Sequence, residues 1–175
     1  MTETDLHTMI QSWENLALMV RYISDYPEYL DLLMAKTKDD TQPENWRAAW
    51  MIDKINDKHP EMVKKYIPEM TSFVQITKNA GKKRHLLKLI SLNEIQEDNI
   101  ATLLNFCLDV FTDAAEPVAV RVHAMQILFN IATKEPDFAG ELTELIENEI
   151  ELHYSAGLSS RGKKLLKKLY KMKKH

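Results

Sequence analysis

Four segments of the sequence share one pattern at a constant spacing of 38 residues: RAAWMIDKI (47–55), HLLKLISLN (85–93), HAMQILFNI (123–131) and RGKKLLKKL (161–169). Two adjacent apolar residues recur at their centre, from Met51 and Ile52 in the first to Leu165 and Leu166 in the last. The last apolar position is interrupted once, by Asn93. Apolar residues three and four apart, repeated at this period, are typical of stacked amphipathic helices.

The stretches between these segments keep the same register. Met62, Tyr66 and Met70 of one stretch align with Ile100, Leu104 and Leu108 of the next. The sequence therefore predicts an all-α fold of about nine helices, at about 4–24, 27–38, 43–58, 60–78, 81–94, 97–113, 117–134, 137–153 and 157–173.

The segment PVAVRVHAMQIL (117–128) resembles the second helix of a HEAT repeat, whose pattern is V-R-x-x-A-x-x-x-L. The matching residues are Val120, Arg121, Ala124 and Leu128. Segments 45–55 and 159–169 resemble it more loosely, because their arginine comes two residues later in the pattern. The resemblance implies an armadillo-like, right-handed superhelix of HEAT-like helix pairs. It also implies that the second helices line the concave face, namely 43–58, 81–94, 117–134 and 157–173.

We expect a single domain over residues 1–175, because each helix pair buries its apolar face only by stacking on the next. Residues 1–38 would form an irregular N-terminal cap, residues 39–153 the regular repeats, and residues 157–175 a basic capping helix.

Charge is distributed unevenly along the chain. Residues 157–175 carry eight lysines and arginines and no acidic residue, so the net charge of −3 leaves −11 on the remainder. Such asymmetry indicates a directional field rather than a general affinity for nucleic acid. The basic helix could hold phosphates or an acidic membrane surface, or it could be a solvated cap that suits the helix dipole. Lys82, Lys83 and Arg84 could extend the same basic patch.

Several features favour a cytoplasmic location. No apolar run approaches the roughly 20 residues of a membrane span, and the opening MTETDLHTMIQSWEN lacks the basic-then-apolar order of a secretory signal. Cys107 is the only cysteine, so no intramolecular disulfide can form. It lies on an apolar stripe and is interpreted as a core thiol rather than a reactive one.

Candidate partner-binding residues are those opposite the apolar stripes when the second helices are projected at about 100° per residue. They are Trp46, Trp50, Asp53, Arg84, Lys88, Gln126, Phe129, Lys164 and Lys167. Exposed aromatic residues are good interface anchors, so one interpretation is a peptide-binding groove anchored by Trp50 and Phe129. The other is that Trp46 and Trp50 pack on the N-terminal cap.

A second row on the flank of these helices consists of Arg47, His85, His123 and Arg161. It could sense pH or bind anions, or it could join neighbouring repeats by hydrogen bonds. Glu149 and His153 have a spacing that can bind metal, but a pair alone is not a site. No metal or cofactor is therefore expected.

No motif for catalysis stands out, since the sequence has no phosphate-binding glycine loop, no HExxH and no paired cysteines. We expect a non-catalytic scaffold or adaptor, a monomer or weak dimer, that binds a protein or peptide on its concave face. The alternative is a nucleic-acid-binding HEAT-like protein related to alkylated-DNA glycosylases, because Trp46, Trp50 and Asp53 supply the residue types those enzymes use. Asp57 and the acidic N-terminal half count against it.

Overall fold

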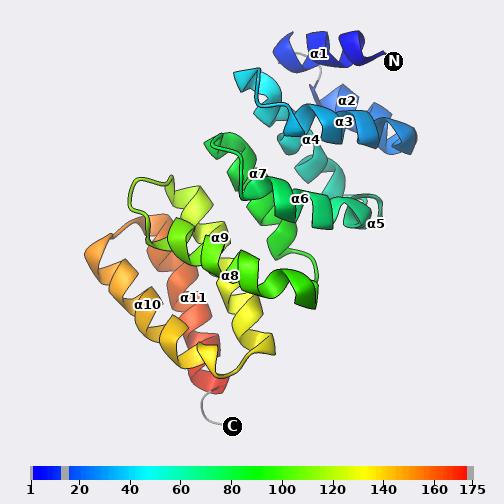
Figure 1. Cartoon of the computed structure of the whole chain (residues 1–175). Helices are drawn as coiled ribbons and strands as arrows, with labels where there is room; N and C mark the ends of the chain where they lie inside the picture. The colour runs from blue at the N-terminus through cyan, green and yellow to red at the C-terminus, as the bar shows by residue number, and fades with distance from the viewer. Residues whose placement is uncertain (1, 13–15, 173–175) are drawn as a thin grey trace. The chain divides into compact units, whose positions relative to one another are not determined.

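The computed structural model describes residues 2–12 and 16–172, and all of the regular structure among them is helical (Figure 1). The chain divides into two compact units, Met1–Asn93 (unit 1) and Glu94–His175 (unit 2). The prediction of an all-α fold is confirmed.

Unit 1 begins with two helices where the sequence predicted one over 4–24. The intervening residues 13–15 lie outside the described part of the chain. The α-helices of this unit are α1 (Glu3–Ser12), α2 (Leu16–Asp25), α3 (Leu30–Lys38), α4 (Trp46–Asn56), α5 (Pro60–Val63), α6 (Ile67–Val74) and α7 (Ala80–Ser91). Short 3-10 turns over Pro27–Tyr29 and Pro43–Asn45 lead into α3 and α4.

The helix expected over 60–78 is interrupted, and Pro68 supplies the reason. Proline has no N–H to donate and its ring clashes with the carbonyl four residues earlier. The chain therefore forms a 3-10 turn at Lys64–Tyr66 between α5 and α6. Beyond α6, the Asn79 side chain accepts a hydrogen bond of 3.1 Å from the Lys82 amide and caps α7.

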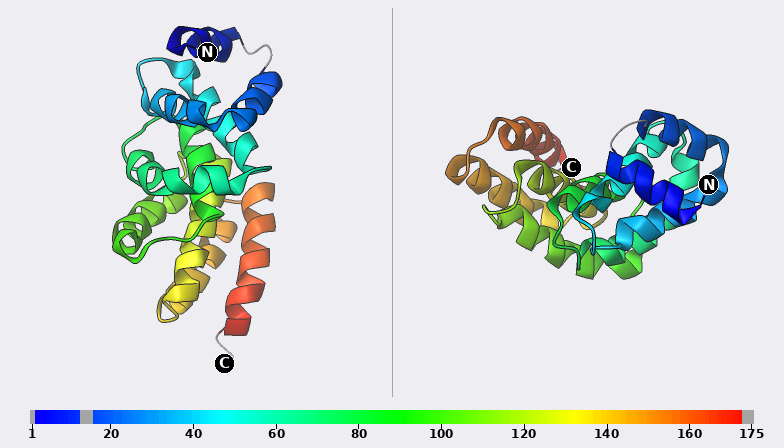
Figure 2. Two further views of the ribbon diagram at one scale, coloured as in Figure 1. Left: turned by 90° about the vertical axis from the view of Figure 1, so that its right-hand side faces the viewer. Right: turned by 90° about the horizontal axis from the view of Figure 1, so that it is seen from above.

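Unit 2 consists of four longer helices at nearly the predicted positions: α8 (Glu97–Thr112), α9 (Val118–Lys134), α10 (Phe138–Leu152) and α11 (Ala156–Met172). α9 packs against α8, α10 and α11. Figure 2 shows α9 and α11, in yellow and red, running side by side. This pair carries the candidate residues of unit 2.

The apolar positions that repeat every 38 residues are buried as predicted. Met51, Ile52, Leu89, Ile90, Ile127, Leu128, Leu165 and Leu166 are all at most 9% exposed. Asn93, the interruption in the pattern, lies beyond the end of α7 and donates a hydrogen bond of 2.8 Å to the Leu89 carbonyl. The only polar residue at this apolar position of the repeat thus lies beyond the end of its helix.

Cys107 is completely buried in α8, which confirms it as a core thiol. Burial raises the pKa of this thiol, because the thiolate would lose its hydration. In the described part of the chain, no helix combines the length and apolarity needed to cross a membrane.

Candidate partner-binding site

The nine candidate residues fall into two groups, one in each unit. Trp46, Trp50 and Asp53 lie on α4, with Arg84 and Lys88 on α7 of the same unit. In unit 2, Gln126 and Phe129 lie on α9, with Lys164 and Lys167 on α11.

The outward position expected for Asp53 is wrong. Its side chain is only 3% exposed, and its carboxylate lies 2.9 Å from His85 Nδ1 and accepts a hydrogen bond from Lys88 Nζ. Asp53 therefore faces α7, the next second helix of the repeat, and not solvent.

Asp53 and Lys88 stabilise each other's charge. Burial opposes the Asp53 carboxylate, but hydrogen bonds from His85 and Lys88 outweigh it and lower the pKa of Asp53. Burial also opposes the Lys88 ammonium, but its bonds to Asp53 and Asp57 raise the pKa of Lys88. The pair is thus charged at neutral pH and links α4 to α7.

Trp46 packs against α7. Its ring stacks on His85 with centroids 6.2 Å apart, and a Cβ atom at Gly81 would lie 3.0 Å from the Cβ and Cγ atoms of Trp46. The glycine thus permits a close approach that a larger residue would prevent. Trp50 is half-buried and Arg84 is exposed, so the anchoring role of Trp50 stays a prediction.

Lys82 does not belong to a surface patch, contrary to expectation. Its side chain is fully buried, and its Nζ donates to the Asp39 carbonyl at 2.7 Å and to the Asp40 carboxylate at 2.6 Å. Lys82 therefore satisfies acceptors just beyond the end of α3, a contact that spacing alone could not reveal.

The row of Arg47, His85 and Arg161 joins neighbouring helices, which confirms the structural interpretation for these three. Arg47 donates two bonds of 2.7 Å to the Ile10 and Gln11 carbonyls near the end of α1. His85 contacts Asp53 of α4, and Arg161 of α11 donates a bond of 2.8 Å to the Gln126 side chain of α9.

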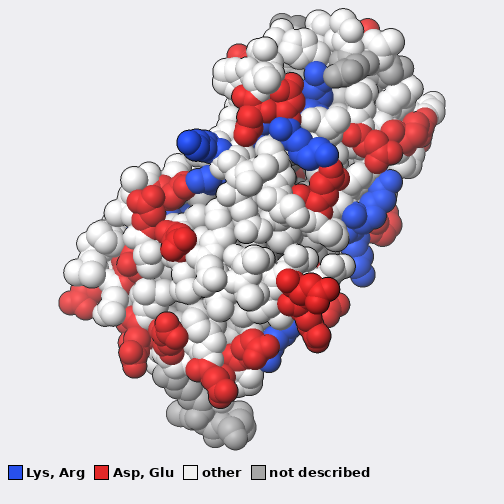
Figure 3. All heavy atoms as spheres, in the orientation of Figure 1, with Lys and Arg blue, Asp and Glu red and all other residues white. Residues whose placement is uncertain are grey.

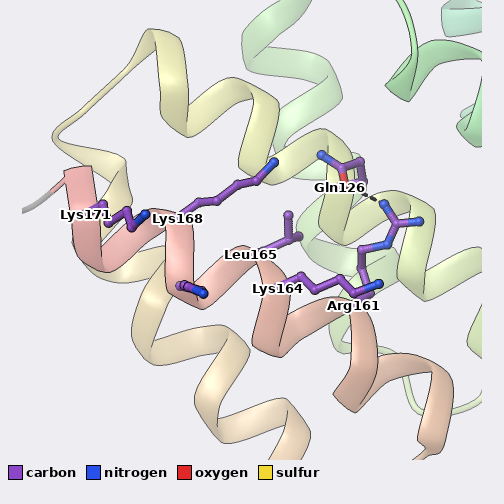
Figure 4. A pocket seen from close by; sticks show the side chains of 7 residues that line it. Gln126, Arg161, Lys164, Leu165, Lys168 and Lys171 are labelled. Carbon is purple, nitrogen blue, oxygen red and sulfur yellow. Dashed lines mark hydrogen bonds between the residues drawn. The ribbon is translucent and has the colours of Figure 1, made fainter.

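The basic groove is a hollow of about 400 Å³ along α11, with Gln126 of the neighbouring helix α9 at its border (Figure 4). Its lining residues are Gln126, Arg161, Lys164, Leu165, Lys167, Lys168 and Lys171. Three of the nine candidates, Gln126, Lys164 and Lys167, come together here. The sequence interpretation placed Lys171 on the same outward side of this helix but missed Lys168 as a lining residue, although its spacing of four residues from Lys164 was the available signal.

The expectation that Phe129 is an exposed anchor is also wrong. Phe129 is 7% exposed, and Lys168 Nζ lies over its ring at 5.5 Å from the centroid. Phe129 and Asp53 occupy the same position of the 38-residue repeat, and each is covered by the second helix that follows. Lys167 occupies this position on α11 and is exposed, because no helix follows α11 in the described part of unit 2.

Arg121, the residue that carries the HEAT resemblance, has a structural role. Its side chain is 4% exposed; the guanidinium donates to the Phe111 carbonyl at 2.8 Å and forms an ion pair with Glu149. His153 Nε2 lies 4.0 Å from the same Glu149 carboxylate. The Glu149 carboxylate is therefore held by Arg121, and the described residues contain no cluster of three or more potential metal ligands.

The acidic side chains of unit 2 lie outside α11, which carries none. α10 carries five glutamates and no lysine or arginine, and it packs directly against α11. Figure 3 shows acidic residues spread over α8 and α10 on the face in view, with few basic ones among them. The positive charge of unit 2 is thus concentrated along α11.

A second hollow, of about 280 Å³, lies between α1 and α2. Its lining is mostly apolar and consists of Asp5, Met9, Leu18, Met19 and Tyr22. Leu18 is 64% exposed. The sequence interpretation gave this surface no function, and it contains none of the nine candidate residues.

Comparison with known proteins identifies the family. A HEAT repeat domain model matches residues 3–169, which is nearly the whole chain. Searches of curated proteins and of solved structures returned no match. The match spans both units and agrees with the resemblance carried by Arg121 and its neighbours. The chain therefore belongs to the HEAT repeat domain family.

Proposed function

We propose that the protein is a non-catalytic scaffold that binds a protein or peptide partner, with the basic groove as a principal contact surface. HEAT repeats generally mediate protein interactions and are typically non-catalytic. The family supports the general role, and the groove supports the choice of surface.

The observation that carries this proposal is the lack of internal partners for the groove's charge. Arg161, Lys164, Lys167 and Lys171 have no acidic partner among the described residues, whereas Lys88, Lys82 and Arg121 elsewhere are each paired with a carboxylate. A concentrated, uncompensated charge favours association with an oppositely charged surface.

Nucleic-acid binding is the competing function. The burial of Asp53 argues against base-excision chemistry, and the glutamates of α10 beside α11 would repel a long polyanion. Protein binding is therefore the function that the charge distribution supports better.

Affinity capture from the native cytoplasm tests the proposal. The bait is compared with the double variant Lys164→Glu/Lys167→Glu and with Trp50→Ala, each with and without nuclease. The matched control is Lys58→Glu/Lys78→Glu, which makes the same charge change at two exposed lysines of unit 1. We expect a protein that survives nuclease and is lost in the groove variant but not in the control. Recovery of nucleic acid alone, or equal capture by all variants, would contradict the proposal.

We further propose a cytoplasmic location and a monomeric or weakly dimeric state. The buried, single cysteine is compatible with a reducing compartment. Fractionation of the native cell and sedimentation equilibrium of the purified chain would test these two statements.

A further inference from the structure

We infer that the basic groove binds an acidic helix of the partner, with carboxylates repeated at three- and four-residue spacing along one face. This inference rests on the proposed function and adds the chemistry and secondary structure of the partner segment.

The basic residues of the groove form one stripe along α11. Arg161, Lys164, Lys168 and Lys171 follow one another at intervals of three, four and three residues, which places them on one face of a helix. At a rise of about 1.5 Å per residue, the stripe is about 15 Å long. A second helix lying along α11 would present acids at the same intervals. Alternate residues of an extended strand are about 6.6 Å apart, so acids on a strand would not stay opposite the basic residues along the stripe.

Arg161 is oriented for recognition without losing its charge. It donates one hydrogen bond of 2.8 Å to the Gln126 amide oxygen (Figure 4). Gln126 in turn donates to the Asn130 side chain at 2.9 Å. Both partners are neutral, so the guanidinium keeps its full positive charge. Its remaining N–H groups can bind a carboxylate in the two-pronged geometry that arginine favours.

The floor of the groove is apolar. Leu165 lies at its base, and the aliphatic stems of Lys164 and Lys168 flank it. Lysine stems cover apolar surface while their ammonium groups stay hydrated. An acidic helix with a leucine between its acids would contact both the apolar floor and the basic side chains of the groove. A bare phosphate would contact only the basic side chains.

The repeat itself supports a helix as the occupant. Asp53 of α4 is covered by α7, and Phe129 of α9 is covered by Lys168 of α11. Lys167 holds the equivalent position on α11 but is exposed. At two earlier positions of the repeat, the equivalent face is thus covered by a further helix. On α11 this face belongs to the groove.

Nucleic acids and membranes fit the groove less well than a peptide does. Single-stranded nucleic acid relies on aromatic faces for stacking, but no aromatic residue lines the groove, and Phe129 is buried beneath Lys168. An anionic bilayer or a duplex would extend past the stripe and meet the glutamates of α10, one of which, Glu147, accepts a hydrogen bond from Tyr170 of α11.

The test uses a fluorescein-labelled, alanine-based peptide of about 20 residues, long enough to be partly helical in water. It carries glutamates three and four residues apart on one face, with leucines between them. A second peptide has the same composition with the glutamates distributed around the helix, and a third has lysine in place of glutamate. Binding to the whole chain is followed by fluorescence anisotropy between about 0.05 M and about 0.3 M salt, over which the screening length falls from about 14 to about 6 Å.

Two neighbouring lysines of α11 provide a matched pair of variants. Lys164→Glu changes a groove residue, whereas Lys163→Glu makes the same change one residue earlier at an exposed position outside the groove. We expect Lys164→Glu to weaken binding of the one-faced peptide at least about threefold and Lys163→Glu less than about twofold. The double variant Lys164→Glu/Lys167→Glu should weaken it about tenfold or more, while circular dichroism stays unchanged. The distributed peptide should bind more weakly than the one-faced peptide.

Other outcomes overturn the inference in distinguishable ways. Equal binding of both acidic peptides, or tighter binding of oligothymidine or phosphatidylserine vesicles, would show a site for polyanions and not for a helix. A salt-sensitive dimer that Lys164→Glu abolishes would assign the groove to a second copy. If no peptide binds but cellular capture still depends on Lys164 and Lys167, the scaffold proposal stands and the acidic helix is wrong. If capture also fails, both are wrong.

Discussion

Replacing Arg121 with methionine should be among the most destabilising single changes in unit 2. Arg121 and Glu149 are both largely buried, at 4% and 7% exposed. Removing one member of a buried ion pair leaves an uncompensated charge and typically costs about 3–5 kcal/mol. The Phe111 carbonyl would also lose the hydrogen bond that Arg121 donates at 2.8 Å. Since small domains are stable by only about 5–15 kcal/mol, Arg121→Met should remove a large share of the free energy of unfolding.

A double-variant cycle measures the interaction between Arg121 and Glu149 separately from the cost of losing either side chain alone. Arg121→Met/Glu149→Leu removes both charges, so most of the loss should be recovered, leaving about 1–3 kcal/mol for the unsatisfied Phe111 carbonyl. Urea unfolding followed by far-ultraviolet circular dichroism measures each free energy. Lys163→Met, at an exposed position, is the control and should change stability by less than about 0.5 kcal/mol. The reasoning is refuted if Arg121→Met costs under about 1 kcal/mol, or if the double variant is less stable than Arg121→Met.

Three further predictions concern other contacts. Phe129→Ala should lower the free energy of unfolding by about 3–5 kcal/mol, because it empties a buried site, and a urea midpoint equal to that of the wild type would show that Phe129 is exposed in solution. Gly162→Val should lower the free energy of unfolding by about 1–3 kcal/mol, since even a Cβ atom there would lie 2.5 Å from Ile150 Cδ1 and 3.1 Å from Ile146 Cγ2. The control is Gly157→Val, where a Cβ atom meets only Val118 at 3.2 Å. Thermal melting of the two variants measures the difference in stability. The lowered pKa of Asp53 means that its charge stabilises the fold above its ordinary value of about 3.9 and that this contribution is lost as pH falls through the lower, folded-state pKa. The stability difference between wild type and Asp53→Asn should therefore shrink below about pH 4, and a difference that stays constant from neutral pH to acid would contradict the ion pair.

The repeat could be predicted from the sequence because stacked helices bury the same positions each time. Met51, Leu89, Ile127 and Leu165 recur at one spacing and are all in the core. Helix ends were predictable where proline or a change of pattern marks them. The interruption near Pro68 was missed because the apolar spacing continues through it, and spacing records side-chain position but not the loss of a backbone donor.

The candidate site was only partly predictable, for a geometric reason. Projection on a single helix separates one apolar side from one solvent side, whereas a helix inside a stack has neighbours before and after it. Asp53 and Phe129 lie opposite the apolar stripe yet face the helix that follows, so they are buried. Lys164 and Lys167 were placed correctly, because on α11 that side is uncovered. The ion pair of Arg121 with Glu149 needed the fold, since 28 residues separate its partners.

Each unit has its own natural spectroscopic or chemical reporter: tryptophan in unit 1 and a cysteine thiol in unit 2. Trp13, Trp46 and Trp50 are the three tryptophans of the chain, and all belong to unit 1. Cys107, the only thiol, is buried in unit 2. Tryptophan fluorescence therefore follows the opening of unit 1, and the rate at which a coloured disulfide reagent reaches Cys107 follows that of unit 2. The two signals can be recorded on the same unlabelled protein, and their coincidence or separation along a denaturant series would show whether the repeat unfolds as one cooperative block or as two.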